Sequence, residues 1–197
     1  MKVLVACEFS GIVREAFRAR GHDATSCDLL PSDSPHHVVS DVFDLLDRNT
    51  YDLVVAHPPC TYLSSSGIHW NKRRPERAAM TDDAAAFFMR FTELECAWAI
   101  ENPVGVMSTR YRKPDQYIQP YDYGHDASKR TGLWLHNLPT LRADPSDYVQ
   151  PRMAQGKPRW ANQTDSGQNR LSPSPDRWKL RATFYQGWAD AMAAQWG

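Results

Sequence analysis

Short apolar runs that end at polar or turn-forming residues constrain the fold of this chain most strongly. They cover residues 3–6, 52–56, 96–100 and 132–135. Other segments carry apolar residues at helical spacing, and the first of these, 12–19, follows a glycine-containing turn. Strand and helix signals that alternate through short links are typical of an α/β domain. We therefore predict an α/β fold whose sheet is mostly parallel.

Length and composition limit the architecture further. The chain has 197 residues, which predicts a single domain spanning 1–197. Apolar residues make up 42% and charged residues 23%, so a disordered chain is excluded and a buried core is expected. No apolar run approaches the roughly 18–20 residues of a membrane helix, and a glutamate occurs too early for a secretory leader. We expect a soluble, cytoplasmic protein that does not enter a membrane.

The cysteines are isolated from one another and form no CxxC pair. A disulfide scaffold and a zinc site are therefore not expected, and no metal ligand is predicted. Each cysteine is instead either a core residue or a reactive one. The four are Cys7, Cys27, Cys60 and Cys96.

Polar side chains follow the predicted strands at the points where each strand ends. Ser10, Asp28, Cys60 and Glu101 all occupy such positions. Ligands of α/β sheets bind at the carboxyl ends of the strands, where these side chains gather. The sequence therefore predicts a functional site at this edge of the sheet.

Three ordered strings resemble motifs of the DNA cytosine-5 methyltransferases. Residues 59–67, PCTYLSSSG, are similar to the PCQxFSxAG loop that carries the family's nucleophile, and residues 101–103, ENP, are similar to its ENV element. Residues 9–12, FSGI, resemble the opening FxGxG turn, although Val13 stands where the family has a second glycine. The resemblance extends from the start of the chain to about residue 142 and resumes in the last segment. It implies a Rossmann-like, S-adenosylmethionine-dependent methyltransferase fold.

The resemblance assigns catalytic roles to Cys60, Glu101 and Arg130. Carbon 5 of cytosine is a poor nucleophile, so the Cys60 thiolate would first add to carbon 6 and create an enamine-like intermediate. Glu101 would contact N3 and the exocyclic amine, and a nearby cation would favour the thiolate. Arg130 is the candidate for the family's arginine at the base carbonyl, but the match needs a one-residue shift, so Lys129 remains an alternative. In a purely structural interpretation, Cys60 is a packing residue and Glu101 an ion-pair partner.

The methyl donor that the resemblance implies is S-adenosylmethionine. A strand-to-helix turn that contains Gly11 lets the backbone approach a ligand, and Asp28 at the end of the second strand is placed to accept ribose hydroxyl groups. Asp41 is similarly placed for the adenine amine. The residues expected around the donor are Phe9, Ser10, Gly11, Asp28, Asp41 and Pro58.

A loop-rich basic segment, residues 144–182, stands in the position of the family's target-recognition region. Within 151–182 there are seven basic and two acidic residues, a net charge of +5, interleaved with Trp160 and Trp178. Such a surface can meet phosphates and stack on bases, although a solvated loop has the same composition. The residues expected to contact the substrate are Ser64, Ser66, Asn102, Arg159, Arg170 and Lys179.

The predicted function is methyl transfer from S-adenosylmethionine to carbon 5 of cytosine in DNA. The short basic segment predicts a single-stranded target or little sequence preference, because groove readout needs several placed side chains. Two alternatives remain: the same chemistry on a free pyrimidine nucleotide, and a catalytically silent nucleic-acid-binding module. The string from His57 to Cys60 also resembles the DPPY element of amino-methyltransferases, with His57 orienting the amine. Cys60, however, lacks the aromatic ring needed at the fourth position.

Overall fold

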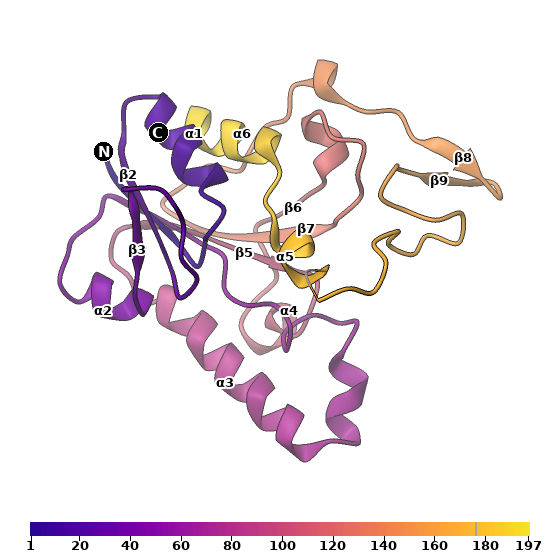
Figure 1. The fold of residues 1–197 in the computed structure, drawn as a ribbon, viewed down its shortest axis with the longest axis horizontal. Helices are drawn as coiled ribbons and strands as arrows, with labels where there is room; N and C mark the ends of the chain where they lie inside the picture. The colour runs from indigo at the N-terminus through magenta and orange to yellow at the C-terminus, as the bar shows by residue number, and fades with distance from the viewer. Residues whose placement is uncertain (176) are drawn as a thin grey trace.

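One mixed sheet organises the part of the chain that the computed structural model describes, residues 1–175 and 177–197 (Figure 1). Its order is β3-β2-β1-β4-β5-β7-β6. All strands of this sheet point the same way except β7, which is antiparallel to both β5 and β6. The strands are β1 (Lys2–Ala6), β2 (Asp23–Asp28), β3 (His37–Val39), β4 (Leu53–Ala56), β5 (Ala97–Pro103), β6 (Gln116–Ile118) and β7 (Thr131–His136). The predicted α/β class and mostly parallel sheet are confirmed.

The central strands are apolar along their whole length because helices cover both faces of the sheet. Residues 3–6 of β1 and 53–56 of β4 are at most 1% exposed. A strand with one solvated face would alternate apolar and polar residues, whereas these two strands do not. The apolar runs at residues 3–6 and 53–56 therefore form the centre of the core.

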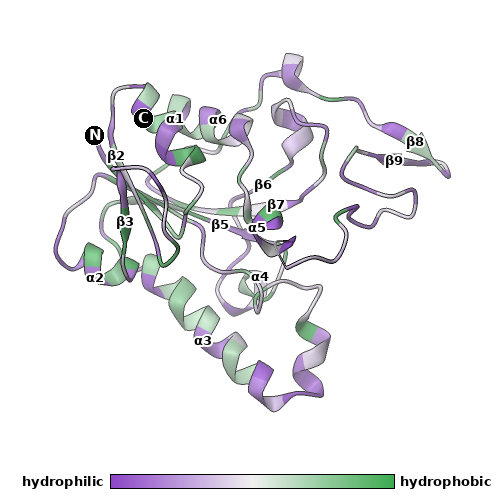
Figure 2. Cartoon of the chain, in the orientation of Figure 1, coloured by the Kyte–Doolittle hydropathy of each residue, from purple (hydrophilic) through white to green (hydrophobic). Residues whose placement is uncertain are grey.

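Two helical layers enclose the sheet (Figures 1 and 2). Phe17 of α1 (Ile12–Ala19) and Trp188 of α6 (Gln186–Trp196) lie fully buried in one core cluster. Phe43 of α2 (Val42–Leu46), Phe88 of α3 (Pro75–Phe91) and Met107 of α4 (Met107–Arg110) lie in a second cluster on the opposite face. None of the helices among the described residues is long and apolar enough to cross a membrane.

The start of α3 differs from the sequence expectation. The capping residues at 81–83 predict a helix that begins there, but α3 begins at Pro75, where the fixed φ of proline suits the first turn. Thr81 lies buried inside the helix, and its hydroxyl donates to the carbonyl oxygens of Tyr62 (3.1 Å) and Arg77 (3.0 Å). Thr81, whose type is common at helix caps, therefore links α3 to the loop that follows β4.

The basic segment lies outside the sheet and contains little regular structure. It includes the hairpin of β8 (Arg152–Ala154) and β9 (Lys157–Arg159), which extends away from the sheet in Figure 1. Gln155 (φ 52°) and Gly156 (φ 71°) form its tight turn, in the left-handed conformation that two-residue hairpin loops require. The segment then returns to the sheet edge through α5 (Arg177–Ala182).

Candidate functional site

The carboxyl ends of β1, β4 and β5 bring the predicted catalytic residues together. These three strands are neighbours, and Ala56 of β4 pairs with Ile100 of β5. The next residues, His57 and Glu101, therefore lie side by side. Cys60 follows His57 after the two prolines that end the strand.

His57 and Glu101 form a buried pair. His57 Nδ1 lies 3.4 Å from Glu101 Oε2, and the two side chains are only 10% and 11% exposed. The other ring nitrogen of His57 and Glu101 Oε1 are buried without a hydrogen-bond partner in the described chain. The ring of Phe184 packs against the imidazole at a centroid distance of 4.7 Å. The site therefore contains two unpartnered polar atoms that a ligand can bind, in a place that water reaches poorly.

Charges around Glu101 keep its carboxyl group ionised. Burial acts to raise the pKa of Glu101, but the hydrogen bond with His57 and the charge of Lys129 outweigh it, so the pKa lies below its usual value. The nearby hydroxyl group of Thr131 also lowers the pKa of Glu101. The resting form at neutral pH is the carboxylate.

The Cys60 loop is positioned by β5. Asn102 is buried, and its Nδ2 donates to the carbonyl oxygen of Pro58 at 2.8 Å. Beyond the cysteine, the amide groups of Leu63 and Ser64 donate to the carbonyl oxygen of Cys60 at 3.1 and 3.0 Å. Cys60 itself is exposed at the head of this turn. One donor of the Asn102 amide group therefore holds the loop, while its oxygen is buried without a partner in the described chain, and contact of Asn102 with substrate stays a prediction.

The Cys60 thiol is protonated in the resting protein. Although solvent reaches the residue, surrounding protein atoms desolvate the thiolate and raise its pKa, and the charge of Glu101 raises it further. Lys129 and Arg181 act in the opposite direction. In the resting site, therefore, Cys60 is a neutral thiol and Glu101 is a carboxylate.

Lys129, and not Arg130, is the cation at this centre. Lys129 interacts electrostatically with both Glu101 and Cys60. The exposed Arg130 places its guanidinium over the ring of Tyr117, 4.1 Å from the ring centroid. The structure therefore brings two of the three predicted catalytic residues together and replaces the third by its neighbour in sequence.

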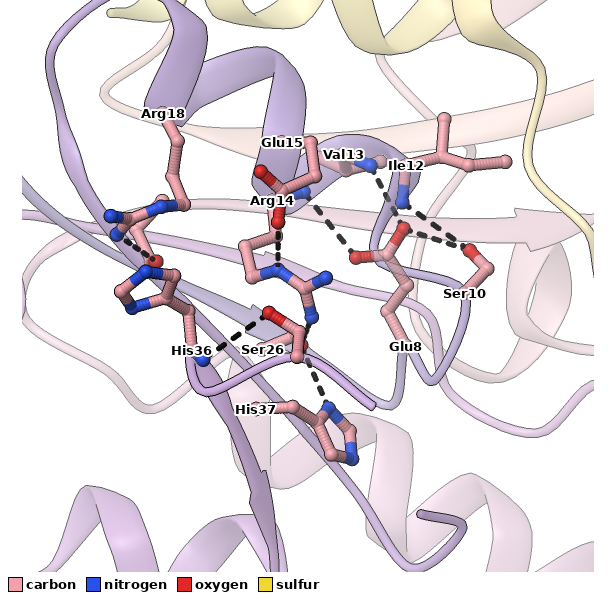
Figure 3. Close-up of polar contacts among 12 residues, drawn as sticks. Glu8, Ser10, Ile12, Val13, Arg14, Glu15, Arg18, Ser26, His36 and His37 are labelled. Atoms are coloured by element: carbon pink, nitrogen blue, oxygen red, sulfur yellow. Dashed lines mark hydrogen bonds and ion pairs between the residues drawn. The ribbon is translucent and has the colours of Figure 1, made fainter. Parts of the chain in front are cut away.

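The turn after β1 is held by a carboxylate that sequence reasoning missed (Figure 3). Glu8 is buried, and its Oε1 accepts from Val13 N (2.9 Å) and Ser10 Oγ (3.1 Å). Gly11 adopts φ 76°, and a side chain there would collide with the guanidinium of Arg14. The glycine is needed, but the amide group of Val13 is already engaged, so this turn offers a ligand fewer free donors than a glycine-rich turn would.

Arg14 also fastens the strand that carries Asp28 (Figure 3). Its Nη1 donates to Ser26 Oγ at 2.6 Å, and Ser26 Oγ lies 2.8 Å from His37 Nδ1. Because Ser26 is on β2 and His37 on β3, this chain of contacts joins α1 to both strands. The position of the carboxyl end of β2 is thereby fixed relative to the Gly11 turn.

A pocket lies beside Cys60 at the ends of β1 and β2. Asp28 Oδ1 accepts from Leu30 N at 2.9 Å, and Asp41 Oδ1 accepts from Phe43 N at 2.8 Å as the cap of α2. The second oxygen of each carboxylate has no hydrogen-bond partner among the described residues. The lining consists of Cys7, Cys27, Asp28, Leu29, Ser40, Asp41, Val42, Pro59, Ala84 and Phe87. Of the residues predicted around the methyl donor, Asp28 and Asp41 line this pocket, whereas Phe9, Ser10, Gly11 and Pro58 do not.

The predicted substrate contacts in the basic segment serve its own structure. Arg159 donates to the carbonyl oxygens of Asp165 (3.1 Å) and Pro158 (2.9 Å), and Arg170 donates to that of Gln163 (2.8 Å). Trp160 is buried and stacks on Tyr121 at a centroid distance of 4.0 Å. These contacts stabilise the loop, and the part of each guanidinium group that they leave unused keeps phosphate binding by Arg159 and Arg170 a prediction.

The remaining predicted substrate contacts lie on two segments, the Cys60 loop and α5. Ser64 and Ser66 lie on the Cys60 loop with their hydroxyl oxygens 3.1 Å apart. Lys179 is exposed on α5. The side chain of Trp178 lies outside the described residues. The serines therefore lie beside the candidate nucleophile, as predicted, and their contact with substrate stays a prediction.

Comparison with known proteins adds no assignment. No model of a protein family matches the chain, and no curated protein matches it. Within the described residues, no group of three or more histidine, cysteine or acidic side chains is arranged to hold a metal ion. The geometry of the site is therefore what supports a function for this chain.

Proposed function

We propose that this protein transfers a methyl group from S-adenosylmethionine to carbon 5 of cytosine in DNA through a covalent adduct at Cys60. The observation that carries the proposal is the convergence of Cys60 with the buried carboxylate of Glu101 at adjacent strand ends. A nucleophile beside a group that can bind N3 and the exocyclic amine is what addition to carbon 6 of cytosine requires.

The sheet and its pocket support the methyl donor. Strands β3-β2-β1-β4-β5 follow the order of a dinucleotide-binding sheet, which binds its ligand at the carboxyl ends. The free carboxylate oxygens of Asp28 and Asp41 suit the ribose hydroxyl groups and the adenine amine, and the apolar walls of Val42 and Phe87 suit a flat ring. These residues fit the group, which when bound supplies an electrophilic methyl carbon.

The protonation states of the site define what its residues do. The thiol proton of Cys60 passes to the Glu101 carboxylate, and from the unpartnered Oε1 it passes to N3 of the base. The Cys60 sulfur forms a bond to carbon 6, and the electron pair of the carbon 5–carbon 6 double bond moves to carbon 5. Lys129 stabilises the thiolate that exists during this transfer. The proton lost by sulfur is thus the proton gained by the ring.

His57 acts as a positioning residue in this scheme. Its hydrogen bond fixes one oxygen of Glu101 and leaves the other for the base. The packing of Phe184 holds the imidazole in this orientation. The amino-methyltransferase alternative is disfavoured because Cys60 lacks the aromatic ring that stacks on the target base.

Identification of the product tests the proposal. Purified protein incubated with S-adenosylmethionine and DNA should yield 5-methylcytosine, detected by mass spectrometry of the digested nucleosides. The Cys60→Ser variant should yield none, because a hydroxyl group is a far weaker nucleophile than a thiolate. Methylation of the exocyclic amine by the wild-type protein would contradict the proposal.

A further inference from the structure

A second concentration of positive charge lies directly after the Cys60 loop, at the 69–77 lobe. This lobe comprises most of η1 (Ile68–Lys72) and the first turn of α3. It contains four basic residues and one acidic residue, and in Figure 2 the ribbon at this end of α3 has the colours of hydrophilic residues. Its most exposed cations are Lys72, Arg73 and Arg74. This shorter cluster is a second candidate for phosphate binding, beside the basic segment predicted from the sequence.

The cations of the lobe are exposed and available to a ligand. The described residues include no carboxylate within ion-pairing distance of Lys72, Arg73 or Arg74. The guanidinium groups of Arg73 and Arg74 lie over the ring of Trp70, 5.8 and 5.2 Å from its centroid. An aromatic ring can hold a guanidinium group by its face while the N–H groups at its edge remain free to donate.

The lobe is fixed to the loop that carries the candidate nucleophile. Arg77 donates from Nη2 to the carbonyl oxygen of Thr61 at 3.0 Å and from Nε to that of Gly67 at 3.3 Å. Its guanidinium also lies over the ring of Tyr62, 4.9 Å from the centroid. A strand of nucleic acid whose base reaches Cys60 would therefore meet the lobe at a defined position.

We propose that the 69–77 lobe is a phosphate clamp for the DNA strand that carries the target base, with Arg73 and Arg74 oriented by Trp70. The inference rests on the proposed function and selects a polymer over a free nucleotide as its substrate. Two guanidinium groups side by side match consecutive phosphates of a backbone, whereas a pyrimidine monophosphate has a single phosphate to offer.

The salt dependence of DNA binding tests the clamp. Fluorescence anisotropy of a labelled oligonucleotide across a sodium chloride series gives the slope of log affinity against log salt. The Arg73→Gln, Arg74→Gln double variant should lower this slope by about two, because each lost phosphate contact removes roughly 0.9. The matched control is Arg48→Gln with Lys113→Gln, which removes the same charge at the opposite, amino-terminal edge of the parallel strands and should leave the slope unchanged.

Trp70 separates an oriented clamp from a diffuse positive surface. Trp70→Ala keeps every charge but removes the ring, so affinity should fall by about threefold or more, while Trp70→Phe should retain most of it. Equal affinity in Trp70→Ala and the wild type would overturn the orientation by Trp70, and equal slopes in the double variant and the wild type would overturn the clamp. Thermal unfolding of each variant verifies that it is folded.

The clamp and the methyl-transfer proposal fail in different ways. A wild-type protein that forms 5-methylcytosine but shows no change of slope in the double variant would overturn the clamp and leave the reaction standing. A wild-type protein that binds DNA through the lobe but forms no 5-methylcytosine would support the clamp and overturn the proposed reaction.

Discussion

At the scale of single residues, the charge of Glu101 controls the reactivity of Cys60. The carboxylate raises the pKa of the thiol in addition to the effect of desolvation, while Lys129 lowers it. Cys60 is therefore mostly protonated at neutral pH, and its reaction with a neutral alkylating reagent should accelerate as pH rises toward and beyond the usual range of a thiol. The charge of Glu101 therefore protects the nucleophile from adventitious chemistry at neutral pH.

Alkylation of Cys60 by iodoacetamide should respond to these charges in opposite directions. At pH 8, Glu101→Gln should react about threefold faster or more, because removal of a negative charge favours the thiolate, and Lys129→Gln should react more slowly. The rate is measured on the Cys60 peptide by mass spectrometry. Glu95→Gln removes the same charge from the exposed residue just before β5, at the opposite edge of the sheet, and should change nothing. A slower reaction in Glu101→Gln would contradict the assigned protonation states.

At the scale of elements, the Cys60 loop depends on its contact with the residues after β5. The amide groups of Ser65 and Val106 donate to the carbonyl oxygens of Val104 (3.0 Å) and Leu63 (2.9 Å). Ser64 and Gly105 form an isolated antiparallel bridge between them. This short pairing holds the loop close to the strand that carries Glu101.

Gly105 is the position at which this contact is most sensitive. A Cβ atom there would collide with the backbone carbonyl of Leu63, which cannot move without shifting the loop. Gly105→Ala should lower the free energy of unfolding by about 1–3 kcal/mol and reduce methyl transfer. Gly21→Ala is the comparison, because Gly21 has φ 85° but open space around it, so it should cost about 1–2 kcal/mol and leave the activity of the folded protein intact. Chemical denaturation and an activity assay measure both effects, and full activity in Gly105→Ala would contradict this role of the loop contact.

At the scale of the whole molecule, the sequence predicts the centre of the sheet better than its edges. The apolar runs locate β1, β4, β5 and β7, because strands buried on both faces are mostly apolar along their length. The three-residue strands β3 and β6 lie at the sheet edges and carry no such signal. Spacing also places Cys60 and Glu101 correctly, since both follow apolar runs whose strands are neighbours.

The remaining features depend on contacts that a sequence does not display. Arg159 and Arg170 are predicted from the sequence as phosphate ligands, and the structure adds that each also donates to backbone carbonyl groups of its own loop. Nothing in the sequence distinguishes Glu8 from a surface acid. In the structure it is buried and accepts a hydrogen bond from the first turn of α1. The contacts that orient the arginines of the 69–77 lobe against Trp70 and fasten the lobe to the Cys60 loop likewise appear only in the folded structure.

Covalent trapping tests the central claim, that Cys60 attacks carbon 6 of cytosine, most directly. A DNA substrate that contains 5-fluorocytosine should remain bound to the protein in the presence of S-adenosylmethionine, because fluorine cannot leave as a proton does in the final elimination. Intact-mass spectrometry should then show one adduct in the wild type and in Cys96→Ser, and none in Cys60→Ser. Trapping that persists in Cys60→Ser, or 5-methylcytosine formation by that variant at the wild-type rate, would contradict the account.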